Sequence, residues 1–558
     1  MKLSGSAILL ECLKEQGVDT IFGYPGGAIL NVYDELYRQQ DHFKHILTAH
    51  EQGASHAADG YARATGRVGV CFATSGPGAT NLVTGLATAM MDSIPVVAIT
   101  CNVGLPLIGR DSFQEVDISG ITMPITKHNF MVRDVACLAD TLRRAFRIAM
   151  EGRRGPVLVD IPKNVTGALC EFERKEKEEI HRRTDKMREE DIEKVVAMLQ
   201  DTRKPFLLIG GGAVGAEAAE EVRTFMELMN CPVTDTLMGR GVVPNDHPNN
   251  AGMIGMHGTK AANIGLSAAD LVVSVGARFD DRVTGDTAKF CTNAKIIHLD
   301  VDSAEIDKNI ITDAHIIGDL KVVLQEINRR LPQQNHQDWL DEINDMKETY
   351  PLRIDRGRLT APAIIEVINE LVDVDNTLIV TEVGQHQMWA AQHYNFRHPR
   401  TLLTSGGLGT MGYGLGAAIG AKYAMPHKTV INIAGDGCFR MNLNELTTVA
   451  RYRVPIIQMI FNNTVLGMVR QWQTLFYERN YSQTTFTDDI DFVKISEALN
   501  VKAVRVTTLE ELRVALGAAL QEQVPVVLDC RLDKDDSVFP MVPAGSGLDG
   551  VFDETDLG

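Results

Sequence analysis

Short runs of apolar residues alternate along this chain with glycine turns and helical patterns. The clearest run, residues 429–434, is followed by a Gly-Asp-Gly turn at 435–437 and then by apolar residues at helical spacing. A second run, residues 455–461, ends on an Asn-Asn pair. Continuous apolar runs of this length are typical of buried strands in parallel sheets. This stretch therefore predicts a strand–helix–strand unit of an α/β sheet.

The same succession occurs earlier, in residues 67–102. That segment and residues 428–463 have equal length, and each contains an apolar run, a glycine loop, a helical pattern and an apolar run led by proline. Asn81 and Asn442 occupy the same offset within the two segments. Such a repeat predicts that the first and last parts of the chain are copies of one parallel unit. Only the later copy carries the aspartate, Asp436.

Further strand patterns lie between the copies, two of them followed by glycines, at residues 205–212 and 271–276. Charge-rich residues 173–194 predict a linker that enters a solvated helix, and polar residues 331–360 predict a second link. A chain of 558 residues is too long for one core. The predicted fold class is α/β, with three domains that are each a mostly parallel doubly wound sheet: residues 1–165, 190–335 and 361–558.

Composition narrows the function classes. Hydrophobic residues make up 44% and charged residues 23% of the chain, as in ordinary globular proteins. The formal net charge of −18 argues against nucleic acid or an anionic membrane surface as a partner. Nine cysteines without a Cys-x-x-Cys motif suggest neither a zinc site nor a disulfide framework. With no signal peptide and no apolar stretch long enough to span a bilayer, we expect a cytoplasmic protein.

Asp436 and Asn463 follow two successive predicted strands. Ligands of open α/β sheets bind beyond the carboxyl ends of the strands, so both side chains are expected to face one crevice. A carboxylate with an amide oxygen suits Mg²⁺ shared with a phosphate group. Gly435 and Gly437 allow backbone N–H groups to approach that phosphate. A lone Gly-Asp-Gly is more often a simple turn, but the asparagine at the end of the next strand favours a site.

Residues 435–463 resemble the diphosphate–Mg²⁺ motif of thiamine diphosphate enzymes. Over essentially the whole chain, the sequence is similar to the catalytic large subunit of the acetohydroxyacid synthase (acetolactate synthase) family. The similarity rests on many dispersed motifs in the same order, which together are more specific than any one of them. These motifs are residues 23–28, 50–53, 112–115, 255–258, 276–282, 383–387, 406–412 and 467–472.

Glu51 stands before a stretch of small residues, and a shielded position is expected for it. The ordinary alternative is a carboxylate on a helix surface. A shielded carboxylate needs a partner, and the resemblance supplies one, because the family places this glutamate at the pyrimidine ring of thiamine diphosphate. Sharing a proton there promotes the ylide, the electron sink of the cofactor. The family has this glutamate on the first domain and the diphosphate site on the third, which implies an active site between two subunits.

The resemblance implies three cofactors: thiamine diphosphate, Mg²⁺ and FAD. The residues that it places at thiamine diphosphate and the metal are Val383, Gly384, Gln385, His386, Gly409, Met411, Gly435, Asp436, Gly437, Asn463 and Val465. The positions that it places at FAD are Arg153, Gly210, Gly211, Gly212, Thr236, Leu237, His257, Gly276, Arg278, Asp300 and Asp319. Without the resemblance, the triple glycine is a weak signal, because it lacks the full G-x-G-x-x-G spacing and fits a tight turn equally well.

Substrate-binding residues are also implied by the family. Arg282 offers a fork of donors that matches a carboxylate, although in isolation an ion pair with Asp280 or Asp281 is the more ordinary role. Trp472 could be a core aromatic, but its polar neighbours in residues 470–473 argue against a deep core position. The full set is Gly27 and Gln114 at the developing oxyanion, Lys163 at the active site, and Met256, Arg282 and Trp472 in the pocket of the second substrate, with Phe113 close by.

The implied reaction decarboxylates pyruvate and ligates the hydroxyethyl unit to a second 2-oxoacid, as in branched-chain amino-acid synthesis. Pyruvate as acceptor gives acetolactate, and 2-oxobutyrate gives acetohydroxybutyrate. The implied assembly is a homodimer or homotetramer, with a separate regulatory small subunit as a potential partner. Three alternatives stay open: a pyruvate oxidase-like flavin oxidoreductase, a FAD-independent catabolic acetolactate synthase, and a catalytically silent ligand-binding protein.

Overall fold

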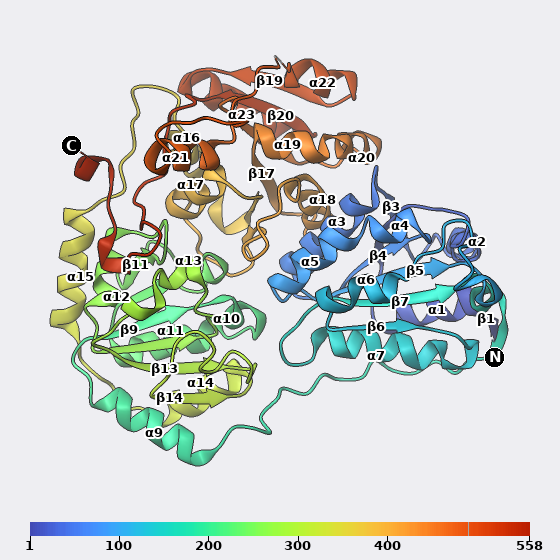
Figure 1. The fold of residues 1–558 in the computed structure, drawn as a ribbon, viewed down its shortest axis with the longest axis horizontal. Coiled ribbons are helices and arrows are strands. Elements are labelled where there is room, and N and C mark those ends of the chain that lie inside the picture. The colour runs from blue at the N-terminus through green and yellow to red at the C-terminus, as the bar shows by residue number, and fades with distance from the viewer. Residues whose placement is uncertain (489, 558) are drawn as a thin grey trace.

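The computed structural model describes residues 1–488 and 490–557 and contains three six-stranded parallel sheets with helices on their faces (Figure 1). The sheets follow one another along the chain and define an N-terminal, a middle and a C-terminal domain. The predicted α/β fold with three parallel sheets is therefore confirmed. A small antiparallel sheet of β1 (Lys2–Ser4) and β8 (Leu169–Glu171) joins the two ends of the N-terminal domain.

The N-terminal sheet has the strand order β3-β2-β4-β5-β7-β6. Helices cover both faces, so its central strands are continuous apolar runs rather than alternating patterns. Its strands are β2 (Thr20–Gly23), β3 (Lys44–Leu47), β4 (Gly69–Ala73), β5 (Val96–Asn102), β6 (His128–Met131) and β7 (Val157–Pro162). Its helices are α1 (Gly5–Glu15), α2 (Leu30–Arg38), α3 (Glu51–Thr65), α4 (Pro77–Thr80), α5 (Val83–Met91), α6 (Ile118–Thr122), α7 (Leu138–Met150) and α8 (Lys163–Gly167).

The C-terminal sheet repeats this topology, with the order β16-β15-β17-β18-β20-β19. In both sheets the strands of the domain stand in the order second, first, third, fourth, sixth, fifth, which confirms the duplication predicted from the sequence. Its strands are β15 (Thr377–Thr381), β16 (Leu402–Leu403), β17 (Thr429–Gly435), β18 (Ile457–Asn462), β19 (Lys502–Val506) and β20 (Val526–Arg531). Its helices are α16 (Ala361–Leu371), α17 (Gln385–His393), α18 (Gly414–Ala424), α19 (Asp436–Asn442), α20 (Leu446–Tyr452), α21 (Gly467–Phe476), α22 (Phe492–Ala498) and α23 (Leu509–Glu522).

The middle sheet has a different order, β11-β10-β9-β12-β13-β14. Counted along the chain this is third, second, first, fourth, fifth, sixth, the order of dinucleotide-binding sheets, whose ligands bind where the order reverses, between β9 and β12. Its strands are β9 (Pro205–Ile209), β10 (Val233–Asp235), β11 (Asn250–Met253), β12 (Leu271–Val275), β13 (Lys295–Asp300) and β14 (Ala314–Ile317). Its helices are α9 (Glu189–Gln200), α10 (Gly211–Gly215), α11 (Ala219–Met229), α12 (Lys260–Ser267), α13 (Asp281–Thr284), α14 (Leu320–Arg330) and α15 (Gln337–Thr349).

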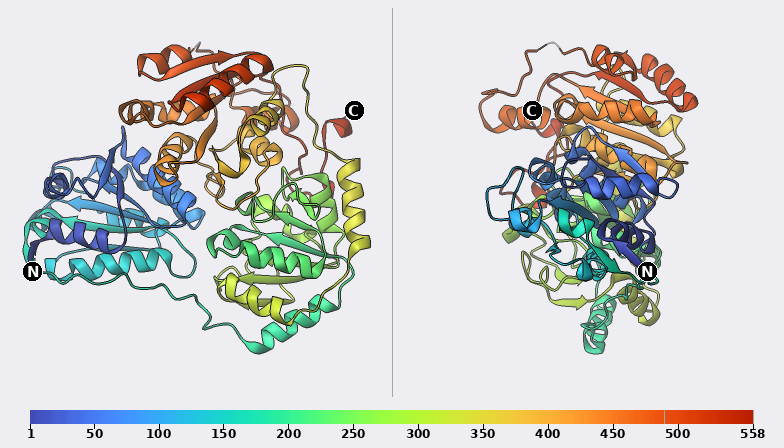
Figure 2. Two further views of the ribbon diagram at one scale, coloured as in Figure 1. Left: turned by 180° about the vertical axis from the view of Figure 1, so that it is seen from behind. Right: turned by 90° about the vertical axis from the view of Figure 1, so that its right-hand side faces the viewer.

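The two predicted links differ in the structure. Residues 172–188 form no helix or strand and run along the outside of the molecule from the N-terminal domain to α9, as predicted (Figure 2). Residues 331–360 instead contain α15, whose Trp339, Leu340 and Ile343 are buried against the middle domain. The polar residues of α15 masked this apolar stripe in the sequence pattern, so the second predicted link contains a packed helix of 13 residues.

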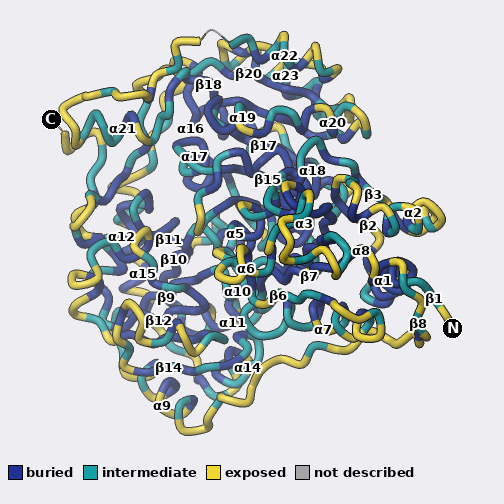
Figure 3. Tube along the Cα trace, turned by 45° about the vertical axis from the view of Figure 1, so that its right-hand side comes forward, coloured by how far each residue is buried: buried dark blue, intermediate teal, exposed yellow. Residues whose placement is uncertain are grey.

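Helices α3 and α18 join the N-terminal and C-terminal domains through small residues (Figure 3). An ideal Cβ on Gly60 would lie 2.2 Å from the carbonyl oxygen of Ala417, and one on Gly420 would lie 1.9 Å from that of Ala57. The two helix backbones therefore touch. One hydrophobic core extends across this contact and takes residues from both domains. The N-terminal and C-terminal domains are consequently one packed unit.

Gly60→Ala is expected to lower the midpoint of thermal unfolding, because the added methyl group would force α3 and α18 apart. Overpacking of this kind costs about 1–3 kcal/mol. Gly517, inside α23, is a matched control, since a Cβ there meets nothing within 4 Å. Gly517→Ala should keep or raise the midpoint, because alanine favours a helix over glycine. Equal midpoints for the two variants would contradict the close contact.

Candidate active site

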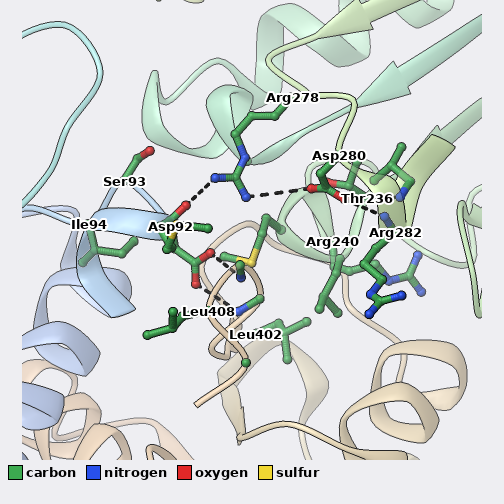
Figure 4. Close-up of a pocket in the computed structure, with 18 of the residues that line it drawn as sticks. Asp92, Ser93, Ile94, Thr236, Arg240, Arg278, Asp280, Arg282, Leu402 and Leu408 are labelled. Atoms are coloured by element: carbon green, nitrogen blue, oxygen red, sulfur yellow. Dashed lines mark hydrogen bonds and ion pairs between the residues drawn. The ribbon is translucent and has the colours of Figure 1, made fainter. Parts of the chain in front are cut away.

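A cavity of about 1170 Å³ lies where the three domains meet, and its walls come from all of them. Figure 4 shows part of it, with Asp92 from the N-terminal domain, Arg278 from the middle domain and Leu408 from the C-terminal domain around one space. Single small molecules occupy pockets of about 300–1,000 Å³. The cavity therefore has room for more than one ligand.

The C-terminal wall holds the predicted metal site. Asp436 is the first residue of α19, after β17, and Asn463 follows β18, which pairs with β17 in parallel. Asp436 is 1% exposed, and among the described residues neither carboxylate oxygen has a hydrogen-bond partner. Burial raises the pKa of Asp436 to about 7. Unpartnered buried oxygens are costly, so this aspartate fits a hard cation such as Mg²⁺.

The residues predicted at thiamine diphosphate gather around this point. Gly384 (φ +131°) and Gly409 (φ +69°) have backbone conformations that favour glycine, and a Cβ on Gly409 would lie 3.3 Å from Val383 Cγ2. The loop after β15 and the loop before α18 thus approach each other closely. The residues of this set that line the cavity are Val383, Gly384, Gln385, His386, Gly409, Met411, Gly435, Gly437, Asn463 and Val465. Asp436 lies between two of them.

The middle domain places its glycines at the reversal of strand order. Gly210–Gly212 follow β9, and Gly276 follows β12. A Cβ on Gly210 would lie 2.1 Å from Gly276 O, and one on Gly212 would lie 2.8 Å from Gly276 Cα. The glycines are therefore required by contact between two loops, which is more than a tight turn needs. The predicted residues that line this part of the cavity are Arg153, Gly211, Gly212, Thr236, Leu237, His257, Gly276, Arg278, Asp300 and Asp319.

Arg282, Met256 and Trp472 meet at the cavity. Arg282 Nη1 lies 3.6 Å from Met256 Sδ, and its guanidinium carbon lies 5.9 Å from the centroid of the Trp472 ring. The ion pair of Arg282 with Asp281 is long, 3.7 Å, and exposed to solvent, while the Asp280 carboxylate caps α13. The guanidinium is therefore available to a ligand.

Trp472 is half-buried, as expected, but the prediction rested on a wrong premise, namely that its polar neighbours are exposed to solvent. Arg470 and Gln471 are themselves buried. Arg470 forms an ion pair with Asp535 (2.6 Å), and Gln471 Nε2 donates to the carbonyl oxygen of Val538 (2.9 Å). Their polar groups bind the tail that follows β20. The polar character of these two residues therefore does not indicate exposure to solvent.

Five predicted residues lie elsewhere and form what we call the N-terminal half-site: Gly27, Glu51, Phe113, Gln114 and Lys163. Within residues 1–488 and 490–557, none of them lines the cavity. They gather at the carboxyl end of the N-terminal sheet, where Lys163 Nζ donates to Gly27 O (2.9 Å) and Asn81 Nδ2 donates to Glu51 Oε2 (3.0 Å). Glu51 is 9% exposed and Phe113 is 87% exposed. One chain therefore separates the predicted catalytic residues into two groups.

Asp92 was not anticipated from the sequence, although it shapes the cavity. Its carboxylate accepts hydrogen bonds from the N–H groups of Gly406 (3.0 Å) and Gly407 (2.7 Å), in the loop that leads to Gly409 (Figure 4). Arg63 Nη2 pairs with it at 2.9 Å. These contacts fix the glycine loop against the N-terminal domain. No local pattern marks Asp92, because its partners are distant along the chain.

Fold and site together define the class of thiamine diphosphate enzymes, and three family models match the chain in this order. The N-terminal TPP binding domain of thiamine pyrophosphate enzymes matches residues 3–121, their central domain matches residues 192–327, and their C-terminal TPP binding domain matches residues 382–530. Each match falls on one of the three sheets.

Relatives that match nearly the whole chain identify the family within the class of thiamine diphosphate enzymes. An acetolactate synthase of Mycobacterium bovis is 48% identical over 568 residues, covering 99% of this chain and 91% of that protein. The acetolactate synthase large subunit of Corynebacterium glutamicum is 47% identical over 560 residues, with coverage of 98% and 89%. A probable acetolactate synthase large subunit of Methanococcus aeolicus is 43% identical over 574 residues, with coverage of 99% and 95%. The chain belongs to the family of acetolactate synthase large subunits.

Proposed function

We propose that this chain decarboxylates pyruvate and transfers the hydroxyethyl unit to a second 2-oxoacid, as the catalytic subunit of an acetolactate synthase. The observation that carries the proposal is that one cavity is lined by Arg282, Trp472 and Met256 and also reaches the Asp436–Asn463 site. Thiamine diphosphate, when bound, supplies an electron sink for the carbanion that decarboxylation leaves. The acceptor, pyruvate or 2-oxobutyrate, carries a carboxylate that suits the solvent-accessible guanidinium of Arg282.

The chain's own residues are assigned to binding, proton transfer and charge stabilisation. Asp436 and Asn463, with Mg²⁺ and Val465, would hold the diphosphate of the cofactor. Glu51 would share a proton with its pyrimidine ring. Gly27 N–H and Gln114 would donate to the oxygen of the substrate that becomes negative, and Lys163 would complete that region. These roles follow the family resemblance and the position of each residue.

A second copy of the chain is needed to assemble this site. The N-terminal half-site lies outside the cavity, and Phe113 and Gly27 are exposed in the single chain. We therefore propose a homodimer, or a homotetramer built from such dimers, in which the N-terminal half-site of one copy faces the cavity of the other. A regulatory small subunit remains a proposed partner on the resemblance alone.

FAD is the proposed ligand of the middle-domain part of the cavity. The strand order of the middle sheet, the touching loops of Gly210–Gly212 and Gly276, and a volume beyond that of one small molecule support it. The ligation transfers no net electrons to a flavin, so its proposed contribution is to shape the cavity. The domain boundaries 1–165, 190–335 and 361–558 remain part of this proposal.

In the described residues, we find no helix that combines the length and the apolar character needed to cross a bilayer. All nine cysteines are free thiols, and seven of them are buried. Free thiols are typical of reducing compartments. We propose the cytoplasm as the location on that basis.

The test of the function is acetolactate formation from pyruvate, measured by colour development with and without added thiamine diphosphate and Mg²⁺. The expected result is product only in the presence of thiamine diphosphate. Bleaching of a bound flavin in proportion to pyruvate would favour the pyruvate oxidase alternative. A purified protein that is active and colourless would favour the FAD-independent synthase, and one that binds thiamine diphosphate without turnover would be the silent binding protein.

Trp472→Leu is expected to lower the preference for 2-oxobutyrate over pyruvate by about tenfold or more, because an apolar wall can discriminate one methylene by about 1–3 kcal/mol. Acetolactate formation should persist. Tyr477→Leu, an exposed aromatic just beyond α21, is the control and should leave the ratio unchanged. Competition between the two oxoacids gives the ratio directly. An unchanged ratio in the Trp472 variant would mean that the acceptor pocket lies elsewhere.

A further inference from the structure

A carboxylate of the C-terminal domain is buried against the segment that leads into Glu51. Glu445 ends the 3₁₀ turn η7 (Leu443–Glu445) and is 0% exposed. Its carboxylate accepts hydrogen bonds from the backbone N–H groups of Ala49 (3.1 Å to each oxygen) and His50 (3.0 Å). Thr448 Oγ1 donates to the same carboxylate at 2.6 Å. The two backbone donors that precede Glu51 are therefore bound by a side chain of another domain.

Glu445 is also in close contact with the first turn of α3. An ideal Cβ on Gly53 would lie 2.0 Å from Glu445 Oε1, so the first turn of α3 rests directly on the carboxylate. The N–H of Leu47 donates to the hydroxyl of Tyr452, at the end of α20, at 3.0 Å. Three backbone amides, one at the end of β3 and two between β3 and α3, are thus hydrogen-bonded to the C-terminal domain. Because Glu51 is the first residue of α3, these hydrogen bonds fix the backbone position from which its side chain extends.

The donors around Glu445 suit a carboxylate better than an amide. Burial raises the pKa of Glu445, and the hydrogen bonds from Thr448, Ala49 and His50 offset this only in part. Three N–H or O–H groups point at two oxygens, and both oxygens accept. A glutamine would offer one acceptor oxygen and would turn an N–H₂ group toward at least one of these donors.

We propose that Glu445 is a positioning residue for Glu51: it fixes the backbone from which Glu51 reaches the pyrimidine ring of thiamine diphosphate. The inference rests on the proposed role of Glu51, and it adds the group that holds Glu51 in place. Catalytic groups need placement within fractions of an ångström, and a misplacement of about 1 Å costs about 100-fold. A rigid, three-donor clamp supplies that placement.

The same segment also holds the metal site. Asp436 begins α19, and Glu445 follows it directly through η7. In the proposed dimer, Asp436 of a given chain would hold the cofactor in the cavity of that chain. Glu445 of the same chain would position Glu51, which serves the cofactor in the cavity of the second chain. The two active sites thus share one short segment in each chain.

The experiment compares Glu445→Ala, Glu445→Gln and the control Glu15→Gln in the full-length protein. Glu15 is a buried carboxylate paired with Arg143 at 2.8 Å in the N-terminal domain, away from the site. The readout is hydrogen–deuterium exchange at the thiazolium C2 carbon of bound thiamine diphosphate, without pyruvate. Glu445→Ala is expected to slow exchange by about 10- to 100-fold, with Glu445→Gln between it and the wild type. The affinity for thiamine diphosphate and the rate in Glu15→Gln should stay within about threefold of the wild type.

A double-mutant cycle separates positioning from a general loss of structure. If Glu445 acts through Glu51, Glu445→Ala should cause no further slowing in a Glu51→Gln background. Wild-type exchange in Glu445→Ala, or slowing that multiplies with that of Glu51→Gln, would overturn the proposal. Where Glu445→Ala does not fold, Glu445→Gln carries the same cycle. Wild-type exchange in Glu51→Gln alone would instead refute the role of Glu51, so the two failures are distinguishable.

Discussion

Replacing Asp436 with alanine is expected to abolish retention of thiamine diphosphate and Mg²⁺ while the fold stays intact. Asp436 has two buried oxygens that receive no hydrogen bond from residues 1–488 and 490–557, so a cation suits them as a partner. Without the carboxylate, the proposed metal site would lose its only charged ligand. Cofactor content after gel filtration, and calorimetric titration with both ligands, give the measurement. Asp488→Ala, which removes an exposed partner of Arg440, is the control and should retain the cofactor.

Stability adds an independent readout for Asp436. A buried carboxylate without partners destabilises the protein, so the alanine variant should unfold at the same temperature as the cofactor-free wild type, or above it. Added Mg²⁺ and thiamine diphosphate should raise the midpoint of the wild type, because a ligand stabilises the folded state that binds it. Only the variant should fail to respond. Normal thiamine diphosphate binding by the variant would remove Asp436 from the metal site.

Glu51→Gln is expected to bind thiamine diphosphate normally and to slow exchange at the thiazolium C2 carbon by about two to four orders of magnitude, the usual worth of acid–base help. Glutamine keeps the shape of the side chain and its contact with Asn81 but cannot share a proton with the pyrimidine ring. Nuclear magnetic resonance of quenched samples gives the exchange rate. Glu35→Gln, on α2 of the same domain, should exchange at the wild-type rate.

Mixing the two variants checks whether Glu51 serves the cavity of a second copy. In a mixed dimer of Asp436→Ala and Glu51→Gln chains, one site combines the intact Glu51 of the first with the intact Asp436 of the second. That site should be active, although each variant alone is not. Mixtures with no more activity than the separate variants would place Glu51 outside a shared site.

Local patterns in the sequence predicted the sheets and the Asp436–Asn463 pair, whereas most of the other candidate site residues came from the family resemblance. Buried parallel strands are continuous apolar runs, and residues at their carboxyl ends converge, which is how Asp436 and Asn463 were found. Several strands were not predicted; among them, β16 has only two residues and β6 is half-buried, so neither shows such a run. Arg282 and Trp472 came from the family resemblance, and their meeting at the cavity depends on contacts between two domains.

Residues that act across domains left no local trace. Asp92 binds Gly406 and Gly407, and Glu445 binds Ala49 and His50. Each carboxylate stands at a helix end or a turn, where acidic residues are common for ordinary reasons. Their partners are backbone groups, which have no side-chain identity to recognise. Only the three-dimensional packing shows that these carboxylates are buried and bound.

The contact between α3 and α18 also affects the order in which the chain folds during synthesis. Helix α3 leaves the ribosome early, but α18 and the apolar residues that complete the shared core are made far later. One of the two hydrophobic cores of the middle domain consists of its own residues and can form in the interval, whereas the other also takes Val542, Leu548 and Val551 from the C-terminal tail. Contacts between residues that are far apart in the sequence form slowly. Until they form, the apolar surfaces that they will cover stay exposed to solvent. The face of the N-terminal domain that packs against α18 therefore stays exposed until the last third of the chain is translated, and we expect a chaperone to protect it.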